Sequence, residues 1–434
     1  MFNLRSAILI LGDLVFFYLS LSLALALRLG GDLTANYFLA HFLPFTLVYI
    51  SWLAIFYIFG LYELSSFDKN SYGKFLGALI VCLAAGVALF YFFPLLGIAP
   101  KTNLLLHISI FGLLSFFFRQ WVLGLFLKKF HARVAIIGQN PQTKELIDRM
   151  NKDPQLGYKI AGHIKNKKDI YKEAKKRKID ILIVAEAAAS DPELSDDLYK
   201  CLSLKISIID LAKAYEIICG KIPLSFASQT WFLENINERG KYFYERTKRL
   251  LDIAGACLIM VAVSPLVLLI CLALKLEDGG PIFFLQKRTG KDNKDFILIK
   301  FRTINDDKEK NGPIWAKNND PRATKVGKVL RAHHLNEIPQ IINVLKGEMS
   351  LIGPRPERPE FVARLEKNIP HYNIRHLTKP GLTGWAQTNF RYARSEADSF
   401  EKLQYDLYYL KNRTFLLDLL IMLKTFNLLF RKEE

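Results

Sequence analysis

Hydrophobic residues are concentrated in the first third of this 434-residue chain. Four long apolar stretches follow one another there, near Ala7–Leu29, Phe38–Leu61, Phe75–Leu96 and Leu104–Leu127. A helix needs about 20 apolar residues to cross a bilayer, and each stretch is long enough. The pattern therefore predicts a membrane α-helical bundle of four spans over residues 1–130.

Two charged residues, Asp13 and Arg119, lie inside or beside these stretches. An ionised side chain is costly in hydrocarbon unless it has a partner. We therefore expect a paired structural role for them rather than an ion path.

Lysine and arginine residues flank the apolar stretches unequally. The larger set follows the second and fourth stretches and consists of Lys69, Lys74, Lys128, Lys129 and Arg133; the smaller set consists of Arg28 and Lys101. Because basic residues favour the cytoplasmic side of a membrane, both ends of the predicted bundle should face the cytosol.

Between residues 131 and 235 the pattern changes to short β-branched runs that alternate with helical segments. The candidate strands are Arg133–Ile137, Ile160–Ile164, Ile179–Val184 and Ile206–Ile209. Such alternation predicts a parallel sheet in a Rossmann-like α/β domain. The turn after the first strand, Gly138-Gln139-Asn140-Pro141, lacks the repeated glycines of a pyrophosphate-binding loop. We expect this domain to act as a scaffold or regulator.

A fifth apolar run, Ile253–Leu274, is also long enough to cross a bilayer, but basic residues flank both of its ends. Positive charge on both sides indicates that both ends stay in the cytosol. Ser264 and Pro265 lie in the middle of the run, where proline removes a backbone donor and bends a helix. A re-entrant helix, which enters and leaves one leaflet, satisfies both observations.

Composition narrows the class of partner. Hydrophobic residues make up 51% of the chain and charged residues 23%, with a formal net charge of +18. This charge suits nucleic acid, or else anionic lipid and phosphate ligands. Membrane spans favour the second, so nucleic acid is not an expected partner. The five cysteines include no Cys-x-x-Cys pair, which indicates neither a zinc site nor a disulfide framework.

From Gly279 onward the chain carries short motifs rich in glycine, proline, arginine and lysine. They include Gln286-Lys287-Arg288-Thr289-Gly290, Lys300-Phe301-Arg302-Thr303, Leu335-Asn336-Glu337-Ile338-Pro339-Gln340, Gly353-Pro354-Arg355-Pro356 and Lys379-Pro380-Gly381-Leu382-Thr383-Gly384. Arginine offers a planar fork of donors that matches phosphate oxygens, and lysine offers a point charge. Rigid turns carrying these side chains beside a membrane helix suit a site that holds several phosphates at the lipid surface.

On these motifs, residues 241–425 resemble the catalytic domain of the monotopic polyprenyl-phosphate phosphoglycosyl transferases, the bacterial sugar transferase family. With the spans and the α/β domain, the chain is similar to the long form of this family, the undecaprenyl-phosphate hexose phosphotransferases. The resemblance implies a mainly α monotopic catalytic domain over residues 236–434. Its re-entrant helix, near residues 250–275, would be bent at Ser264-Pro265.

The resemblance also implies an activity. The enzyme would transfer a sugar-1-phosphate from a UDP-sugar to undecaprenyl phosphate and release UMP, at the first membrane step of exopolysaccharide, capsule or O-antigen synthesis. It would lie in the bacterial inner membrane with its catalytic domain in the cytoplasm. The implied route is ping-pong, in which an aspartate attacks the phosphate that bears the sugar, and Mg2+ neutralises the diphosphate.

One position departs from the family pattern. The family pairs aspartate with glutamate where this chain has Asn336-Glu337. A neutral carboxamide is a poor nucleophile and a weaker magnesium ligand than a carboxylate. Three alternatives stay open: Glu337 acts alone as nucleophile or metal ligand while Asn336 orients a phosphate, the lipid phosphate attacks directly, or this copy is inactive.

By resemblance, the other candidate site residues bind phosphates of the nucleotide sugar or of the lipid. They are Arg355, with Pro354 and Pro356 on either side of it, and Lys300, Arg302 and Arg331. The closing stretch, Thr414–Phe430, is expected to form an interfacial amphipathic helix.

Two other functions are alternatives to the transferase activity. A membrane nucleotide-sugar dehydratase or epimerase would need a Tyr-xxx-Lys pair, and Tyr171/Lys175 and Tyr244/Lys248 have that spacing, but no glycine-rich loop accompanies them. A binding scaffold that has lost its nucleophile is supported only by Asn336. The membrane bundle and the α/β domain also offer surface for a possible homodimer.

Overall fold

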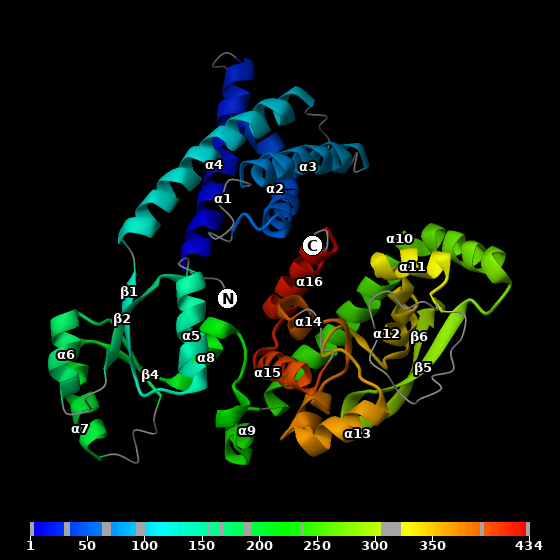
Figure 1. Ribbon diagram of the computed structural model, residues 1–434. Helices are drawn as coiled ribbons and strands as arrows, with labels where there is room; N and C mark the ends of the chain where they lie inside the picture. The colour runs from blue at the N-terminus through cyan, green and yellow to red at the C-terminus, as the bar shows by residue number, and fades with distance from the viewer. Residues whose placement is uncertain are drawn as a thin grey trace. The chain divides into compact units, whose positions relative to one another are not determined.

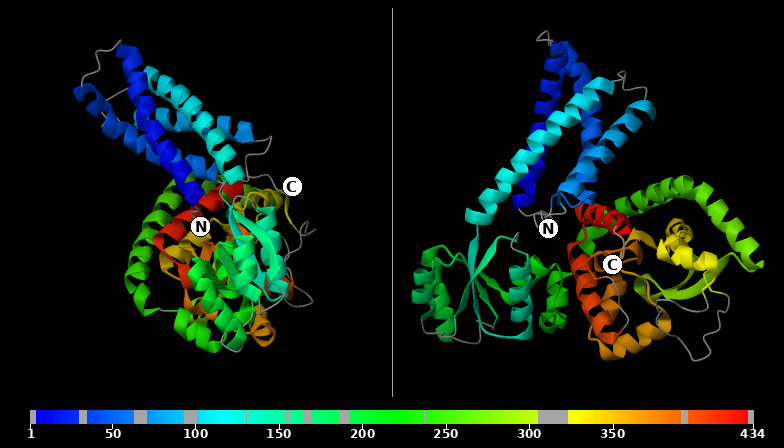
Figure 2. Two further views of the ribbon diagram at one scale, coloured as in Figure 1. Left: turned by 90° about the vertical axis from the view of Figure 1, so that its left-hand side faces the viewer. Right: turned by 45° about the horizontal axis from the view of Figure 1, so that its top comes forward.

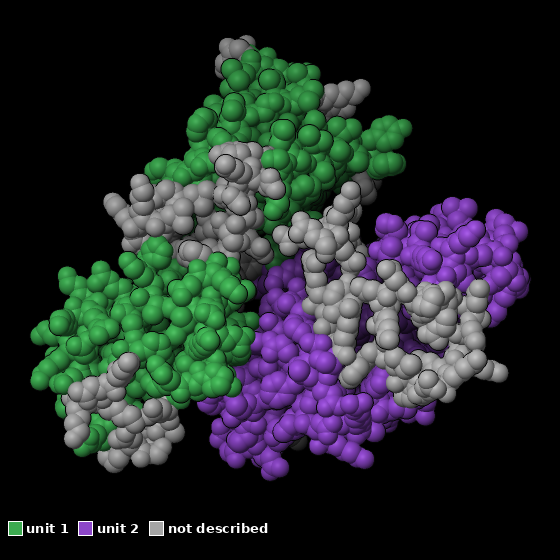
Figure 3. Space-filling model, in the orientation of Figure 1, with its two compact units in different colours: residues 1–219 green, residues 220–434 purple. Residues whose placement is uncertain are grey.

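The computed structural model describes residues 4–29, 35–62, 71–92, 101–129, 131–153, 156–164, 169–185, 192–236, 238–304, 323–390 and 395–430. It divides into two compact units, Met1–Cys219 and Gly220–Glu434 (Figures 1 and 3). Each unit has hydrophobic cores of its own.

Four long apolar helices open the first unit: α1 (Leu4–Leu29), α2 (Ala35–Ile58), α3 (Ser71–Phe92) and α4 (Lys101–Lys129). They share a core in which Phe17, Tyr49, Trp52 and Phe111 are buried. With α10 of the second unit, five helices among the described residues are long and apolar enough to cross a membrane. The four apolar stretches are thus confirmed as helices, while Lys69 and the end of the third stretch, up to Leu96, lie outside the described residues.

Asp13 and Arg119 pair inside this helical core, as expected. Arg119 Nη2 donates to Asp13 Oδ2 at 2.5 Å, and both side chains are almost fully buried. The Ser115 hydroxyl donates to the other carboxylate oxygen, and Arg119 also donates to the carbonyl of Leu61. Asp13 and Arg119 therefore each face an opposite charge or a polar partner, which fits a structural role.

The predicted strands of the α/β region are confirmed to within a few residues. They are β1 (Ala132–Ile137), β2 (Tyr158–Ile164), β3 (Ile181–Val184) and β4 (Ser207–Asp210), all parallel, in the order β2-β1-β3-β4. The helices of this region are α5 (Pro141–Lys152), α6 (Ile170–Arg177), α7 (Pro192–Cys201) and α8 (Leu211–Cys219). Asn140 starts α5 by accepting a hydrogen bond from the Thr143 backbone N–H.

The boundary between the units falls before residue 220, earlier than the 235/236 boundary expected from the sequence. The segment after it, which includes α9 (Gln229–Asn235), belongs to the second unit and packs on later residues of that unit. Trp385 donates to the carbonyl of Gly220, the Ile222 N–H donates to the carbonyl of Gln404, and Lys221 pairs with Glu401. These contacts join residues far apart in sequence, so the local pattern could not reveal them.

Helix α10 (Tyr242–Asp278) is much longer than the apolar run inside it. It is one helix of 37 residues that contains Pro265, rather than two helices separated by a break. Figure 2 shows that α10 changes direction along its length. Its first turns carry polar side chains that the second unit buries: Tyr244 and Lys248 both donate to Asp418, and Asp252 accepts from the Leu351 N–H.

The second unit holds two small sheets, so its description as mainly α was incomplete. Strands β5 (Phe283–Thr289) and β6 (Asp295–Phe301) form an antiparallel hairpin, and β7 (Ser350–Ile352) pairs in parallel with β8 (Gly381–Thr383). The hairpin turn uses positive φ angles at Asp292 and Asn293, which these residue types tolerate. The helices beyond α10 are α11 (Lys325–Ala332), α12 (Gln340–Lys346), α13 (Pro359–Asn368), α14 (Trp385–Asn389), α15 (Glu396–Asn412) and α16 (Phe415–Phe430).

Candidate active site

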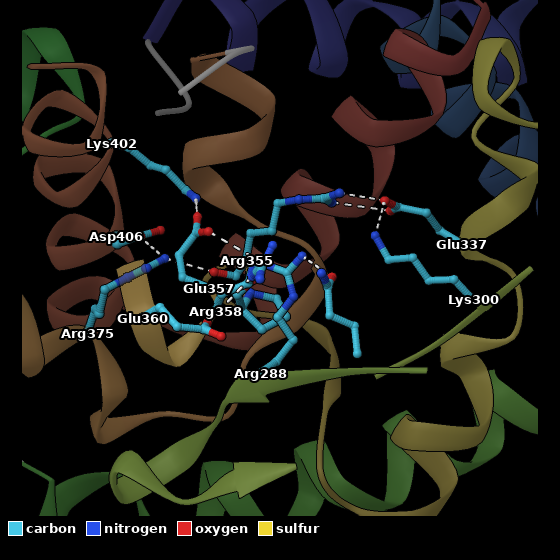
Figure 4. A network of polar contacts seen from close by, with 12 residues as sticks. Arg288, Lys300, Glu337, Arg355, Glu357, Arg358, Glu360, Arg375, Lys402 and Asp406 are labelled. Carbon is cyan, nitrogen blue, oxygen red and sulfur yellow. Dashed lines mark hydrogen bonds and ion pairs between the residues drawn. The ribbon is translucent and has the colours of Figure 1, made fainter. Parts of the chain in front are cut away.

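Three of the predicted site residues meet in the second unit. Lys300 comes from β6, Glu337 from the short 3-10 helix Leu335–Glu337, and Arg355 from the turn that follows β7. Arg355 makes a bidentate contact with Glu337, Nη2 to Oε1 at 2.5 Å and Nη1 to Oε2 at 3.2 Å. Lys300 Nζ donates to Oε1 at 3.3 Å (Figure 4). Two cations thus share one carboxylate.

The turn that carries Arg355 is fixed by backbone packing. Gly353 donates to the carbonyl of Thr383, and Gly381 donates to that of Pro354. A Cβ on Gly353, Gly381 or Gly384 would come within 2.3 Å of backbone atoms of the facing segment. Only glycine lets these two chain segments approach so closely, which explains the spacing of the Gly-Pro motifs.

The segment that carries Glu337 is held between two helices. His334 adopts a left-handed conformation that turns the chain out of α11, and Pro339 precedes the first turn of α12. Asn343 of α12 is fully buried; its side chain accepts from the Ile299 N–H and donates to the carbonyl of Ile297. These bonds tie α12 to β6, the strand that carries Lys300.

Charge and burial oppose one another at these three residues. Burial by itself would raise the pKa of Glu337, but the charges of Arg355 and Lys300 outweigh it and hold the pKa below its usual range. Burial lowers the pKa of Lys300 to about 8, against the opposing attraction of Glu337. Glu337 raises the pKa of Arg355. At neutral pH the carboxylate is ionised and both cations are charged.

A buried ionic network binds the backbone of the turn that carries Arg355 (Figure 4). Arg375 donates to the backbone carbonyl of Arg355 at 2.9 Å and pairs with Asp406 at 2.7 Å. Arg288 of β5 donates to the carbonyl of Pro356 at 3.0 Å. The backbone of the turn is therefore held by two arginines that belong to other elements.

Glu357, the residue after the turn, joins the same network. Lys402 of α15 donates to its carboxylate at 2.6 Å, and Arg288 lies 3.7 Å from it. The Thr289 N–H donates to its backbone carbonyl. Burial would raise the pKa of Glu357, but Lys402, Arg375 and Arg288 together lower it.

Pro354 and Pro356 flank Arg355 in the cluster, and the predicted site residues still to be placed are Arg302, Asn336 and Arg331. Arg302 uses its guanidinium to bind Asp278 and the carbonyl of Pro281 at the end of α10, so its donors hold a helix end. Asn336 lies half-buried next to Glu337, and Arg331 is in the last turn of α11. Neither side chain has a hydrogen bond or ion pair within the described residues. Phosphate binding by Arg302 and Arg331 stays a prediction.

Ser264 and Pro265 lie inside α10, where the Ser264 hydroxyl donates to the carbonyl of Val261. Tyr244 and Lys248, which have the spacing of a dehydratase pair, both donate to Asp418 between α10 and α16. The shared carboxylate gives Tyr244 and Lys248 a structural role, so the spacing of this pair does not indicate a dehydratase.

Sequence reasoning did not identify the network behind the turn. Arg288 stands in a motif that was noted, but Arg375, Lys402 and Asp406 stand outside any motif. The one usable signal was that Arg288, Arg355 and Glu357 stand in short Gly/Pro-rich segments. Nothing local indicates that α15 supplies the counter-charges.

The oxygen ligands that these residues offer are too few for a magnesium ion bound by the protein alone. Mg2+ is usually bound by one or two carboxylates together with substrate phosphates. The described residues contain no group of three His, Cys, Asp or Glu side chains that could hold a metal. Both oxygens of Glu337 already accept hydrogen bonds from cations. These residues therefore do not fit a magnesium centre held by the protein alone.

The sequence of this chain is similar to that of known proteins of one family. The model of the family described as bacterial sugar transferase matches residues 243–432. The chain is 39% identical over 232 residues to the UDP-N-acetylgalactosamine-undecaprenyl-phosphate N-acetylgalactosaminephosphotransferase of Aeromonas hydrophila, covering 52% of this chain and 53% of the relative. It is 33% identical over 326 residues to the UDP-glucose:undecaprenyl-phosphate glucose-1-phosphate transferase of Klebsiella pneumoniae, covering 68% of this chain and 66% of the relative.

These alignments thus span about half and just under two thirds of the two relatives' own lengths. The Klebsiella alignment is longer than the family match, so it extends towards the N-terminus of this chain. A third relative, the uncharacterized sugar transferase EpsL of Bacillus subtilis (strain 168), is 38% identical over 178 residues, which cover 41% of this chain and 84% of the relative. Lys300, Glu337 and Arg355 all lie within the matched residues, and the chain belongs to the bacterial sugar transferase family.

Proposed function

We propose that the protein is a phosphoglycosyl transferase that moves a sugar-1-phosphate from a UDP-sugar to undecaprenyl phosphate and releases UMP. The observation that carries the proposal is the convergence of Lys300 and Arg355 on Glu337 within the family match. Two relatives are named as transferases of this kind, for UDP-N-acetylgalactosamine and for UDP-glucose. The reaction would be the first membrane step of exopolysaccharide, capsule or O-antigen synthesis.

The chemistry of the three side chains suits a diphosphate. The Arg355 guanidinium carries five N–H donors, of which Glu337 takes two, and the Lys300 ammonium adds a point charge beside it. Phosphoryl transfer depends mainly on positioning and on stabilising the charge of the transition state. A half-buried pair of cations, one on a rigid turn and one on β6, supplies both, because charge interactions strengthen away from bulk water.

The same proposal places the protein in the bacterial inner membrane. Helices α1–α4 would span it as a bundle, and α10 would be a re-entrant helix with both ends in the cytoplasm. Exposed Leu258, Leu268 and Leu276 on α10 support contact with lipid, as do exposed Leu416 and Leu419 on α16. The sheet region would be a Rossmann-like scaffold, and the chain could assemble as a homodimer.

Magnesium belongs to the proposal as an ion that enters with the nucleotide sugar. Its ligands would be mainly oxygens of the diphosphate, because Glu337, the carboxylate at the centre of the described cluster, is already paired with two cations. The ion would neutralise charge on the diphosphate and on the departing UMP.

The test is UMP release by the purified full-length protein with Mg2+, undecaprenyl phosphate and a panel of UDP-glucose, UDP-galactose and their N-acetylated forms. Release that depends on one of these sugars and on the lipid is expected. Arg355→Ala should lower kcat/KM by about 100-fold, since a single donor to developing charge commonly contributes this much.

Arg364→Ala is the matched control for that variant. Arg364 is an exposed arginine of the same unit, on α13, and its partner is Glu396. Its loss should leave UMP release unchanged. Absence of UMP release with every UDP-sugar would contradict the proposal and favour a binding scaffold.

A further inference from the structure

Both oxygens of Glu337 are occupied by cations. Oε1 accepts from Arg355 at 2.5 Å and from Lys300 at 3.3 Å, and Oε2 accepts from Arg355 at 3.2 Å. The side chain is only 18% exposed. To attack a phosphorus atom, this carboxylate would have to leave a bidentate ion pair in a partly buried site, where such a pair is strong. The geometry therefore opposes Glu337 as a nucleophile.

Asn336 offers no substitute. Its side chain is a neutral amide, which carries no charge to drive attack on phosphorus. The next carboxylates of the network are also committed, since Glu357 pairs with Lys402 and Asp406 with Arg375. Among the described residues around the Arg355 turn, each carboxylate that this network contains has a cationic partner.

The three central side chains instead form a phosphate-binding group. Arg355 and Lys300 carry two positive charges and Glu337 carries one negative charge, so the group keeps an excess of one positive charge. Glu337 holds the two cations side by side and fixes their spacing. Without it, two like charges in a half-buried site would repel one another.

We infer that Glu337 is a positioning residue, and that the phosphate of the lipid acceptor itself attacks the nucleotide sugar with no covalent enzyme intermediate. This inference rests on the proposed function. An oxygen of undecaprenyl phosphate attacks the phosphorus that bears the sugar and forms a new P–O bond. The bond from that phosphorus to the bridging oxygen breaks, and its electron pair leaves on UMP. The products are undecaprenyl diphosphate sugar and UMP, and no proton has to move.

Isotope exchange separates this route from a ping-pong route. A covalent route lets labelled UMP enter the UDP-sugar pool in the absence of any lipid acceptor, because the first half-reaction is reversible on its own. Direct attack does not. The experiment uses full-length protein, Mg2+, the UDP-sugar that supports UMP release, and labelled UMP, with and without undecaprenyl phosphate.

The native protein should transfer sugar phosphate to the lipid and show no exchange without it. Asn336→Asp supplies the carboxylate that the family pattern has, in nearly the same volume, and should gain acceptor-independent exchange. This variant shows that the assay detects a covalent route in this fold.

Three results would overturn the inference. Acceptor-independent exchange by the native protein would establish a covalent intermediate. An inactive native protein whose transfer is restored by Asn336→Asp would show that the fold requires the missing aspartate. Inactivity of both proteins with every UDP-sugar would remove the proposed function as well, so its failure is distinguishable from that of the inference.

Glu337→Gln gives a second measurement. A positioning residue should cost about 100-fold in kcat/KM, the order of loss produced by a small misplacement of binding groups. Removal of a nucleophile costs about a million-fold. A loss near the larger value, with binding of the UDP-sugar intact, would contradict a positioning role.

Discussion

Lys300 is the residue of the site whose charge changes closest to physiological pH. Burial lowers its pKa to about 8, while Arg355 stays charged throughout. If both cations bind the diphosphate, the affinity for the UDP-sugar depends on the protonation of Lys300 alone in mildly alkaline solution. Glu337, with its lowered pKa, does not titrate in this range.

We therefore expect the KM for the UDP-sugar to rise as the pH passes through about 8. The lysine is protonated below this value and neutral above it, so KM should increase by about tenfold for each further pH unit, the slope of one proton. Lys300→Arg should remove the increase, because a guanidinium stays protonated. Steady-state KM values between about pH 6.5 and 9.5 for both proteins test this; an identical alkaline rise in Lys300→Arg would exclude Lys300 as its source.

At the scale of elements, the Arg355 turn is positioned by side chains from β5, from α15 and from the segment between α13 and β8. The side chains of Arg375 and Asp406 are each 2% exposed. Arg375 also donates a hydrogen bond to the backbone carbonyl of Arg355. Removal of one member of such a pair leaves an uncompensated buried charge. The rigidity of the turn and the stability of the second unit therefore depend on the same arginine.

Arg375→Ala should lower the free energy of unfolding by about 3–5 kcal/mol, the cost of breaking a buried pair from one side. Arg364→Ala, which breaks an exposed pair with Glu396, should cost less than about 1 kcal/mol. Denaturant unfolding of the full-length protein, followed by tryptophan fluorescence, compares the two. Equal losses would show that burial of the Arg375 pair has no energetic consequence.

The strands show what local patterns can and cannot predict. Strands β1 and β3 are short β-branched runs in which most residues are buried, and the sequence predicted them. The β5–β6 hairpin was missed because Phe283, Leu285 and Ile297 are apolar yet exposed, which hides the alternation of a half-buried strand. The length of α10 was missed because partners distant in sequence, such as Asp418, bury its polar first turns.

At the scale of the whole molecule, the proposed topology places residues of both units on one side of the membrane. Lys172 in α6 and Asp292 in the β5–β6 turn would both face the cytoplasm, whereas Asn36 at the start of α2 would face the opposite side. The candidate spans and their basic flanks support this arrangement.

Single cysteines at these three positions, in a background without the five native cysteines, test the topology. Lys172→Cys and Asp292→Cys should react with a membrane-impermeant maleimide only in inverted vesicles, and Asn36→Cys only in intact cells. Labelling of Asp292→Cys in intact cells would mean that α10 crosses the membrane.

The candidate site was predictable only in part, because the sequence gives the residues of the site but not the partners that bind them. Glu337, Arg355 and Lys300 stand in recognisable motifs, and the structure brings them together. Arg302 stands in a motif as well, yet it holds the end of α10 through Asp278. A motif gives the type of side chain, but the partner that uses up its donors is set by tertiary packing.

The unbonded side chain of Asn336 has a consequence for heredity. Because it makes no hydrogen bond within the described residues, replacement by the nearly isosteric aspartate breaks no hydrogen bond of the fold and adds one negative charge beside Glu337. The codons of the two amino acids differ by a single transition at the first base, so mutation interconverts them readily. The chemistry of phosphate transfer distinguishes the two amino acids, because only aspartate would place a second carboxylate beside Glu337.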